Sequence, residues 1–162
     1  MFTQNEEYRS TFNEMNRLNE GEVRYYKINE ETKYPSVTSI ISFISRDKFA
    51  AWTAKVGIEE ANRVKEHSTR RGTKLHRVFE VYLQNGDYKS LEEWEDPLIQ
   101  LMFQAAKFYV DTRLDGIYQQ ETPMFSHKLC LAGTVDLICE VDGELSIVDF
   151  KTSKKEKPEE WL

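Results

Sequence analysis

Hydrophobic residues recur at helical spacing over much of the first two thirds of this chain and at strand spacing over the last third. Near the N-terminus, Phe12, Met15 and Leu18 are three residues apart, which predicts an amphipathic helix over 4–20. Residues 22–28 alternate between polar and apolar side chains and include aromatic ones, so we expect a strand there.

The next stretch contains turn signals followed by a helical pattern. Residues 29–32 predict a turn, and residues 34–41 lead into either a helix or a returning strand. Ser45 is a typical N-cap and Gly57 a typical helix end, so we expect a helix over 46–56.

The middle of the chain predicts two helices separated by a glycine. The first covers 58–69 and is ended by Gly72-Thr73, and the second covers 74–84 and stops at Asn85-Gly86. The apolar stripe of the second helix is expected to be buried, and it consists of Leu75, Val78, Phe79, Tyr82 and Leu83.

A further helix is predicted to begin at Asp96-Pro97, because proline is favoured in the first turn of a helix. It is expected to run to about Leu114. Its predicted inward face is formed by Leu98, Leu101, Met102, Ala105, Phe108 and Tyr109.

From Gly116 onward the pattern is typical of strands. The expected strands are 117–122, 126–131, 134–141 and 145–151. Asp142-Gly143 is a dipeptide favoured in tight turns, so the last two strands are predicted to form a hairpin.

These elements predict an α/β fold with the helices first and the sheet last, in which a small central mixed sheet is flanked by helices. A chain of 162 residues without repeats or linkers is expected to form one domain. Its three parts would be an N-terminal helix and hairpin (1–45), a helical part (46–114) and a final sheet (115–162).

The composition is that of a folded globular protein, with 40% hydrophobic and 12% aromatic residues. No apolar run approaches the roughly 20 residues needed to cross a bilayer. The two cysteines, Cys130 and Cys139, exclude a disulfide framework and a four-cysteine metal site within the chain. We therefore expect a reducing, cytoplasmic setting.

The net charge is −6, which disfavours a general nucleic-acid binder, but the charge is unevenly distributed. Basic residues gather at 63–77 and after the predicted hairpin, and such local clusters either form solvated charged faces or bind phosphates. The candidates for phosphate binding in these clusters include Arg70, Arg71, Lys74 and Lys154.

Three charged residues on the predicted hairpin suggest chemistry. Asp149 and Lys151 are two residues apart, so both would point to one face of their strand, and Asp136 interrupts the apolar run of the preceding strand. Buried charges are costly unless they bind a partner. Asp136, Asp149 and the Phe150 carbonyl have the ligand types that hold Mg²⁺ or Mn²⁺, and a neighbouring lysine can orient water or neutralise a phosphate.

On the predicted helix over 74–84, His76 and Glu80 are four residues apart and therefore project from one side. Alone, this spacing is more often an ordinary surface pair than a pair of ligands. Followed by Asp136, Asp149 and Lys151, it predicts that the helix adds ligands to the hairpin.

In these motifs the chain resembles the PD-(D/E)XK nucleases, in their RecB-like branch. Within the branch it is most similar to the group that includes the mitochondrial genome maintenance exonuclease and its phage and bacterial relatives. The matching segments are 34–38, 71–76, Glu80, 121–123, 132–136 and 148–153.

The resemblance implies a restriction-endonuclease-like core and a Mg²⁺- or Mn²⁺-dependent hydrolase that cleaves DNA phosphodiesters. It also implies exonuclease activity that favours single strands, in DNA replication, recombination or repair. By matched position, His76, Asp136 and Asp149 would bind the metal and Lys151 would be the catalytic lysine. Glu80 and Glu121 match further acidic positions of the site, and Thr152 and Ser153 would contact a backbone phosphate.

The chain departs from the family pattern after the Asp-x-Lys strand. Family members continue into a helix that supports the site, whereas this chain ends at Leu162, so the core is expected to lack its last helix or strand. A second copy or a partner chain would then complete the site, and a non-catalytic nucleic-acid-binding module is the alternative function. No iron–sulfur cluster is expected, since only Cys130 and Cys139 are present. A bacterial or phage-infected cell is the favoured setting.

Overall fold

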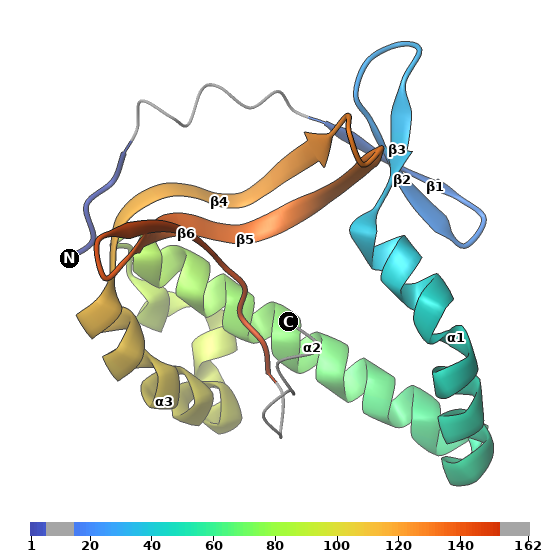
Figure 1. Cartoon of the computed structure of the whole chain (residues 1–162). Coiled ribbons are helices and arrows are strands. Elements are labelled where there is room, and N and C mark those ends of the chain that lie inside the picture. The colour runs from blue at the N-terminus through green and yellow to red at the C-terminus, as the bar shows by residue number, and fades with distance from the viewer. Residues whose placement is uncertain (6–14, 153–162) are drawn as a thin grey trace.

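The computed structural model describes residues 1–5 and 15–152, whose helices and strands are drawn in Figure 1. These residues form two three-stranded antiparallel sheets. The strands of the first sheet are β1 (Asn16–Glu20), β2 (Val23–Lys27) and β3 (Lys33–Pro35). The strands of the second sheet are β4 (Leu114–Ser126), β5 (Leu131–Val141) and β6 (Glu144–Val148).

Helices connect the two sheets in the described part of the chain. They are α1 (Val37–Val56), α2 (Ile58–Leu83) and α3 (Pro97–Arg113), with short 3₁₀ helices at Tyr88–Ser90 and Glu92–Glu95. In Figure 1, α2 runs beneath the second sheet, and α1 extends from β3 to the start of α2. The helices and strands confirm the expected α/β class. Where the sequence led us to expect one mixed sheet, the described residues form two antiparallel ones.

The N-terminal helix predicted over 4–20 is wrong at its end, because residues 16–20 form β1. Leu18 pairs with Tyr25 of β2, and Gly21 takes a positive φ of 62° in the turn between the strands. Pairing with an aromatic strand therefore outweighs the three-residue apolar spacing. Residues 6–14 lie outside the described residues. The strand predicted over 22–28 is confirmed as β2.

The first helix begins earlier than predicted. Ser36, not Ser45, is the N-cap of α1, and its Oγ accepts a hydrogen bond from the Ser39 amide at 3.0 Å. The predicted end at Gly57 is confirmed. For residues 34–41 the sequence left open a helix or a returning strand. The structure contains both, a short strand that ends at Pro35 followed by a helix.

The break predicted at Gly72-Thr73 is wrong, because α2 is continuous from Ile58 to Leu83. One glycine costs a helix only about 1 kcal/mol relative to alanine. The burial of Leu75, Val78 and Phe79 against the core easily offsets that cost. The stop at Asn85 is confirmed, since this residue has a positive φ of 59°.

The third helix starts where it was predicted, but a different face is buried. Asp96 caps α3 by accepting a hydrogen bond from the Leu98 amide at 3.1 Å. The buried residues are Ile99, Phe103 and Val110, and of the predicted face only Met102 packs against the core. The exposed members include Leu98, Leu101, Phe108 and Tyr109. Apolar residues occur on two faces of α3, so periodicity alone could not choose between them.

The second sheet and α2 enclose the main core. The α2 stripe packs as predicted, with Tyr82 partly buried, against Phe103, Leu137 and Cys139. The predicted strands 117–122 and 126–131 are replaced by one long strand, β4, and a turn before β5. The turn at Asp142-Gly143 is confirmed, because both residues have positive φ and β5 pairs antiparallel with β6.

The smaller sheet is attached to the outer end of β5. The buried Tyr26 of β2 shares a hydrogen bond of 2.9 Å with Thr134 Oγ1, and Ser36 forms an isolated bridge with Ala132. These contacts hold the β1–β2 hairpin beside the strand that carries Asp136. None of the described helices combines the length and apolar character needed to cross a membrane.

Candidate metal centre

His76 lies on α2 at the border of the buried stripe, with 26% of its side chain exposed. Its Nε2 is 2.7 Å from the Phe150 carbonyl oxygen. A carbonyl oxygen only accepts hydrogen bonds, so Nε2 carries the hydrogen. In the neutral ring the lone pair is therefore on Nδ1, which lies 3.6 Å from both the Glu121 and the Asp136 carboxylates.

Glu121 and Asp136 face each other across β4 and β5. Gln120 pairs with Leu137 and Thr122 with Val135, which places Glu121 opposite Asp136. Like charges at opposite positions of two strands are destabilising. Burial and then the Asp136 charge raise the pKa of Glu121 above its usual range, against a lowering effect of His76. Such an arrangement favours a bound cation.

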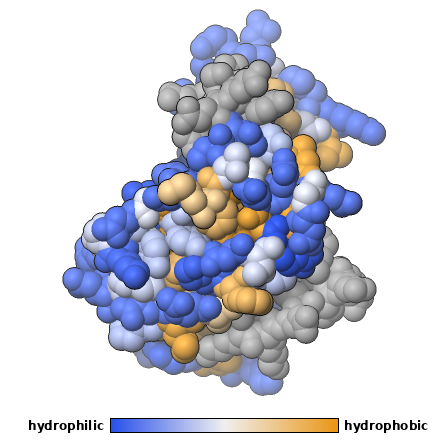
Figure 2. Space-filling model, turned by 90° about the vertical axis from the view of Figure 1, so that its left-hand side faces the viewer, coloured by the Kyte–Doolittle hydropathy of each residue, from blue (hydrophilic) through white to orange (hydrophobic). Residues whose placement is uncertain are grey.

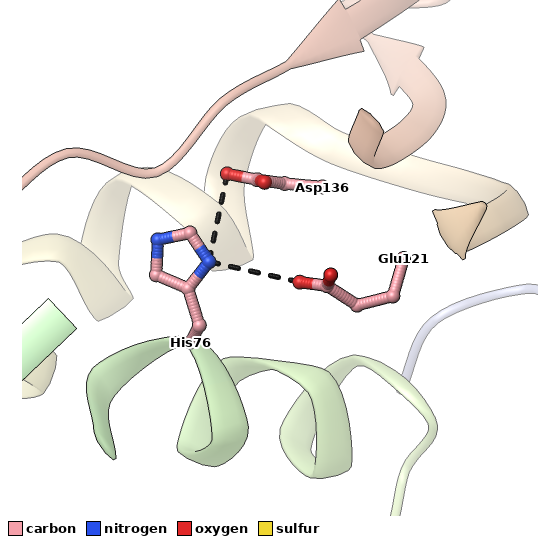
Figure 3. Close-up of side chains that lie close together, drawn as sticks. All are labelled: His76, Glu121 and Asp136. Carbon is pink, nitrogen blue, oxygen red and sulfur yellow. Dashed lines mark ion pairs between the residues drawn. The ribbon is translucent and has the colours of Figure 1, made fainter. Parts of the chain in front are cut away.

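The backbone at Glu121 is also unusual. Glu121 has a positive φ of 47°, which is uncommon for a residue with a side chain and especially so within a strand. Strained conformations of this kind cluster at functional sites. At Glu121, the residue with this conformation also directs its carboxylate at His76 (Figure 3).

Together, His76, Glu121 and Asp136 form a compact ligand set. One ligand atom of each residue lies within 4.8 Å of the others, and no other such group of three occurs in the described ranges. Figure 3 shows the imidazole rising from α2 with one ring nitrogen facing both carboxylates of the sheet. Two carboxylate oxygens and one imidazole nitrogen suit Mg²⁺ or Mn²⁺ and would leave coordination positions for water and a phosphate oxygen.

Phe150 supports this cluster instead of joining it. Its carbonyl accepts from His76 Nε2, on the side of the ring away from Nδ1, so it does not lie among the ligand atoms as predicted. Its amide donates to Asp136 Oδ2 at 2.8 Å. Its ring stacks on Phe79, with centroids 4.6 Å apart. One core residue thus fixes the orientation of two ligands, as outer-shell partners of metal sites do.

The structure does not bring Asp149 and Lys151 to these three residues. β6 ends at Val148, so the strand geometry expected through residue 151 stops before both of them. Lys151 Nζ donates to Asp149 Oδ1 at 2.7 Å, and both side chains are more than half exposed. Asp149 borders a different hollow, between β6 and α3. The pair lie close to each other as expected, and neither belongs to the group formed by His76, Glu121 and Asp136.

Glu80 lies beside the cluster but outside it. It shares a groove with His76 and Glu121, and its charge contributes to the raised pKa of Glu121. Its carboxylate is paired with Arg77 at 2.7 Å. Glu80 therefore lies near the cluster without being one of its three candidate ligands.

The predicted phosphate-binding residues have mixed environments. Lys74 is paired with Asp96 at 2.8 Å, and Arg71 donates to the Thr152 carbonyl at 2.9 Å, so both hold the fold together. Arg70 is exposed. Ser153 and Lys154 lie outside the described residues.

One residue that borders the candidate site escaped sequence reasoning. Arg17 lines the same groove as His76, yet it lies in the stretch that was predicted as a helix. Its position could have been found only by recognising the β1–β2 hairpin. Glu121 was identified as an acidic position of the site, and the structure makes it a metal ligand candidate.

Comparison with known proteins adds no relative: no family model matches this chain, and no curated protein is significantly similar to it.

Proposed function

We propose that this protein is a metal-dependent DNA nuclease that hydrolyses phosphodiester bonds. The observation that carries the proposal is the convergence of His76, Glu121 and Asp136, which come from three separate elements. A groove of about 810 Å³ opens directly beside His76 and Glu121, so a ligand larger than a metal ion has access to the cluster.

In this proposal His76, Glu121 and Asp136 would hold Mg²⁺ or Mn²⁺. When bound, such an ion lowers the pKa of its water and stabilises negative charge on a phosphoryl transition state. His76 would offer Nδ1, because Phe150 keeps the hydrogen on Nε2. Asp136 is oriented by the Phe150 amide, so the chain itself positions two ligands before the metal arrives.

The preference for single strands and for ends is part of the proposal and rests on the resemblance to RecB-like nucleases. An end-labelled linear single strand and a circular single strand of the same length test it, each with Mg²⁺ and with EDTA. We expect metal-dependent loss of the linear strand and persistence of the circle. Digestion of the circle would show that no end is required.

The three-residue cluster is tested separately by metal binding. His76→Ala and Asp136→Asn should abolish both DNA cleavage and the Mn²⁺-induced rise in melting temperature. His67→Ala is a matched control, because His67 is an exposed histidine of the same helix. Undiminished cleavage by both cluster variants would refute the proposal.

Substitutions of Asp149 and Lys151 separate metal binding by the cluster from the catalytic roles that the resemblance implies for these two residues. Because they lie outside the cluster, Asp149→Ala and Lys151→Ala should leave Mn²⁺ stabilisation close to that of the wild type. If the carried-over catalytic roles hold, both variants should nevertheless lose cleavage. Retained cleavage would show that the His76 cluster works without them.

The alternative is a nucleic-acid-binding module that does not cleave, or that cleaves only when another chain completes it. The separation of Asp149 and Lys151 from the cluster favours this alternative. It predicts salt-sensitive DNA binding without turnover under any divalent metal. Cleavage by the purified wild-type chain would exclude both a module that does not cleave and a need for a different partner chain.

A further inference from the structure

The groove beside the metal centre has two walls. One wall is the surface of α2 at Gly72 and Thr73, with His76 one turn further along the helix, and the other includes Arg17 of β1. Glu121 also lines the groove, which is thus continuous with the candidate metal centre.

Arg17 is directed toward the sheet that carries Asp136. It pairs with Tyr26 in the β1–β2 register, and side chains at opposite positions of two antiparallel strands lie on the same face. Tyr26 reaches Thr134 of β5 through its hydroxyl. Thr134 is two residues from Asp136, and alternate residues of a strand share a face. The hairpin therefore presents Arg17 on the metal-centre side.

Within the described part of the chain, nothing neutralises the charge of Arg17. Its side chain is exposed, and it forms no ion pair or hydrogen bond with any described residue. The other arginine of the groove, Arg77, is paired with Glu80 at 2.7 Å. Among the described residues that line the groove, Arg17 is thus the cation that no carboxylate neutralises.

Gly72 supplies an independent observation. Glycine in the interior of a helix is destabilising relative to alanine. A Cβ added to Gly72 would meet only Thr152 Oγ1, at an ordinary contact distance of 3.9 Å. The described residues therefore have no steric need for glycine here. A bare stretch of helix backbone facing a groove permits the close approach of a ligand.

We propose that this groove seats the sugar–phosphate backbone of single-stranded DNA next to the metal centre. Arg17 binds a phosphate neighbouring the one at the metal, and Gly72 allows the strand to lie against α2. The inference rests on the proposed function and adds to it a binding surface and a positioning residue. A guanidinium suits this task because its planar fork binds phosphate through two hydrogen bonds.

The binding test uses the full chain and a fluorescein-labelled single strand in EDTA, where metal-dependent cleavage is absent. Arg17→Ala should weaken binding about tenfold and reduce the slope of log affinity against log salt by about 0.7, the value for one single-strand phosphate contact. Arg17→Lys should recover part of the affinity. Arg24→Ala is the matched control. This substitution removes the same charge from the same hairpin, but Arg24 does not border the groove.

The glycine test separates folding from binding. Gly72→Ala should raise the urea midpoint of unfolding while weakening DNA binding several-fold, and Gly72→Val should weaken binding further. Ser68→Ala, on the exposed surface of α2, should also raise the midpoint but leave binding unchanged. A Gly72→Ala protein that is less stable than the wild type, or that binds DNA equally well, would overturn the role given to Gly72.

Failure of this inference can be distinguished from failure of the proposed function. Wild-type affinity and salt slope in Arg17→Ala overturn the groove assignment, whatever the cleavage result. Binding that depends on Arg17, without any cleavage by the wild type, overturns the nuclease proposal and supports the groove. A wild-type chain that neither binds nor cleaves DNA overturns both.

Discussion

Two carboxylates that face each other across β4 and β5 are the strongest constraint at the scale of single residues. Burial, followed by the charge of Asp136 on the neighbouring strand, raises the pKa of Glu121, so its charged form is disfavoured in the fold. The protein thus gives up stability at this position. A bound cation would recover it, which is why the pair indicates metal binding more strongly than either residue alone.

Glu121→Gln should therefore act in opposite directions without and with metal. In EDTA at neutral pH it removes the repulsion and should stabilise the fold by roughly 0.2–1 kcal/mol, the range for cross-strand pairs. With Mn²⁺, the variant should lack the metal-induced stabilisation of the wild type. Urea unfolding under both conditions measures the two effects, and Glu144→Gln on the exposed end of β6 is the control. A destabilised variant in EDTA would contradict the repulsion argument.

The two cysteines should differ in reactivity because of their environments. Burial, and to a smaller extent the charge of Glu140, raises the pKa of the Cys139 thiol to about 11, whereas Cys130 is exposed. Cys139 should thus remain an unreactive thiol through pH 9 in the folded protein. Alkylation followed by mass spectrometry should modify Cys130 quickly and Cys139 only in denaturant. Rapid double modification of the native protein would show that the core around Cys139 opens easily.

At the scale of elements, α2 links folding to the site. Its buried stripe packs on the sheet, and the same helix presents His76 and Gly72 to the groove. Asp96 then joins α2 to α3, because it caps α3 through the Leu98 amide and also pairs with Lys74. Through these two interactions Asp96 links α2 to α3.

The two roles of Asp96 can be separated by substitution. Asp96→Asn keeps an N-cap acceptor but removes the charge, whereas Asp96→Ala removes both, so Asp96→Ala should have the lower urea midpoint. The hydrogen bond from Lys74, followed by the one from the Leu98 amide, lowers the pKa of Asp96 from 3.8.

The lowered pKa of Asp96 fixes the pH dependence. The stability gained from the Asp96 charge is fully present above pH 3.8 and is lost as the pH falls below that value toward the pKa in the folded state. The difference between wild type and Asp96→Asn should therefore shrink in strong acid. Equal midpoints for Asp96→Asn and Asp96→Ala would show that the cap contributes nothing.

At the scale of the whole molecule, apolar side chains remain exposed along the edge of the second sheet and on α3. β6 is an edge strand, and its Leu145 and Ile147 are 68% and 67% exposed. Leu101 and Phe108 of α3 are also exposed. Figure 2, which views the molecule from the left-hand side of Figure 1, shows apolar side chains at the surface within a largely hydrophilic surround. Edge strands with few charges tend to pair with another chain.

We therefore expect the purified chain to self-associate as its concentration rises. Light scattering at several concentrations should show an increasing mean mass. Replacing Leu145 and Ile147 by lysine should suppress the increase, because charges on an edge strand oppose pairing. The same double substitution at Ile41 and Ile44, which are exposed on α1, is the control for a general change in charge. A constant monomer mass for the wild type would contradict the prediction.

Local patterns in the sequence were sufficient for much of the fold. The α2 stripe, the strand at 22–28, the Asp96-Pro97 helix start and the Asp142-Gly143 turn follow from periodicity and turn chemistry. These features depend on neighbours within a few residues, which the sequence displays directly. His76 and Asp136 were identified as candidate ligands for the same reason, whereas Glu121 was named only through the resemblance to RecB-like nucleases.

Tertiary structure decided what depends on partners distant in the sequence. Pairing with β2 made residues 16–20 a strand, and burial carried α2 through Gly72. Aromatic packing of Phe103 against α2 and the 3₁₀ helices selected which apolar face of α3 is covered. It also left Asp149 and Lys151 outside the cluster of His76, Glu121 and Asp136, because β6 ends at Val148 while Phe150 is held by Phe79 and His76. The sequence alone thus determined which chemical groups were present, and long-range packing determined which of them meet.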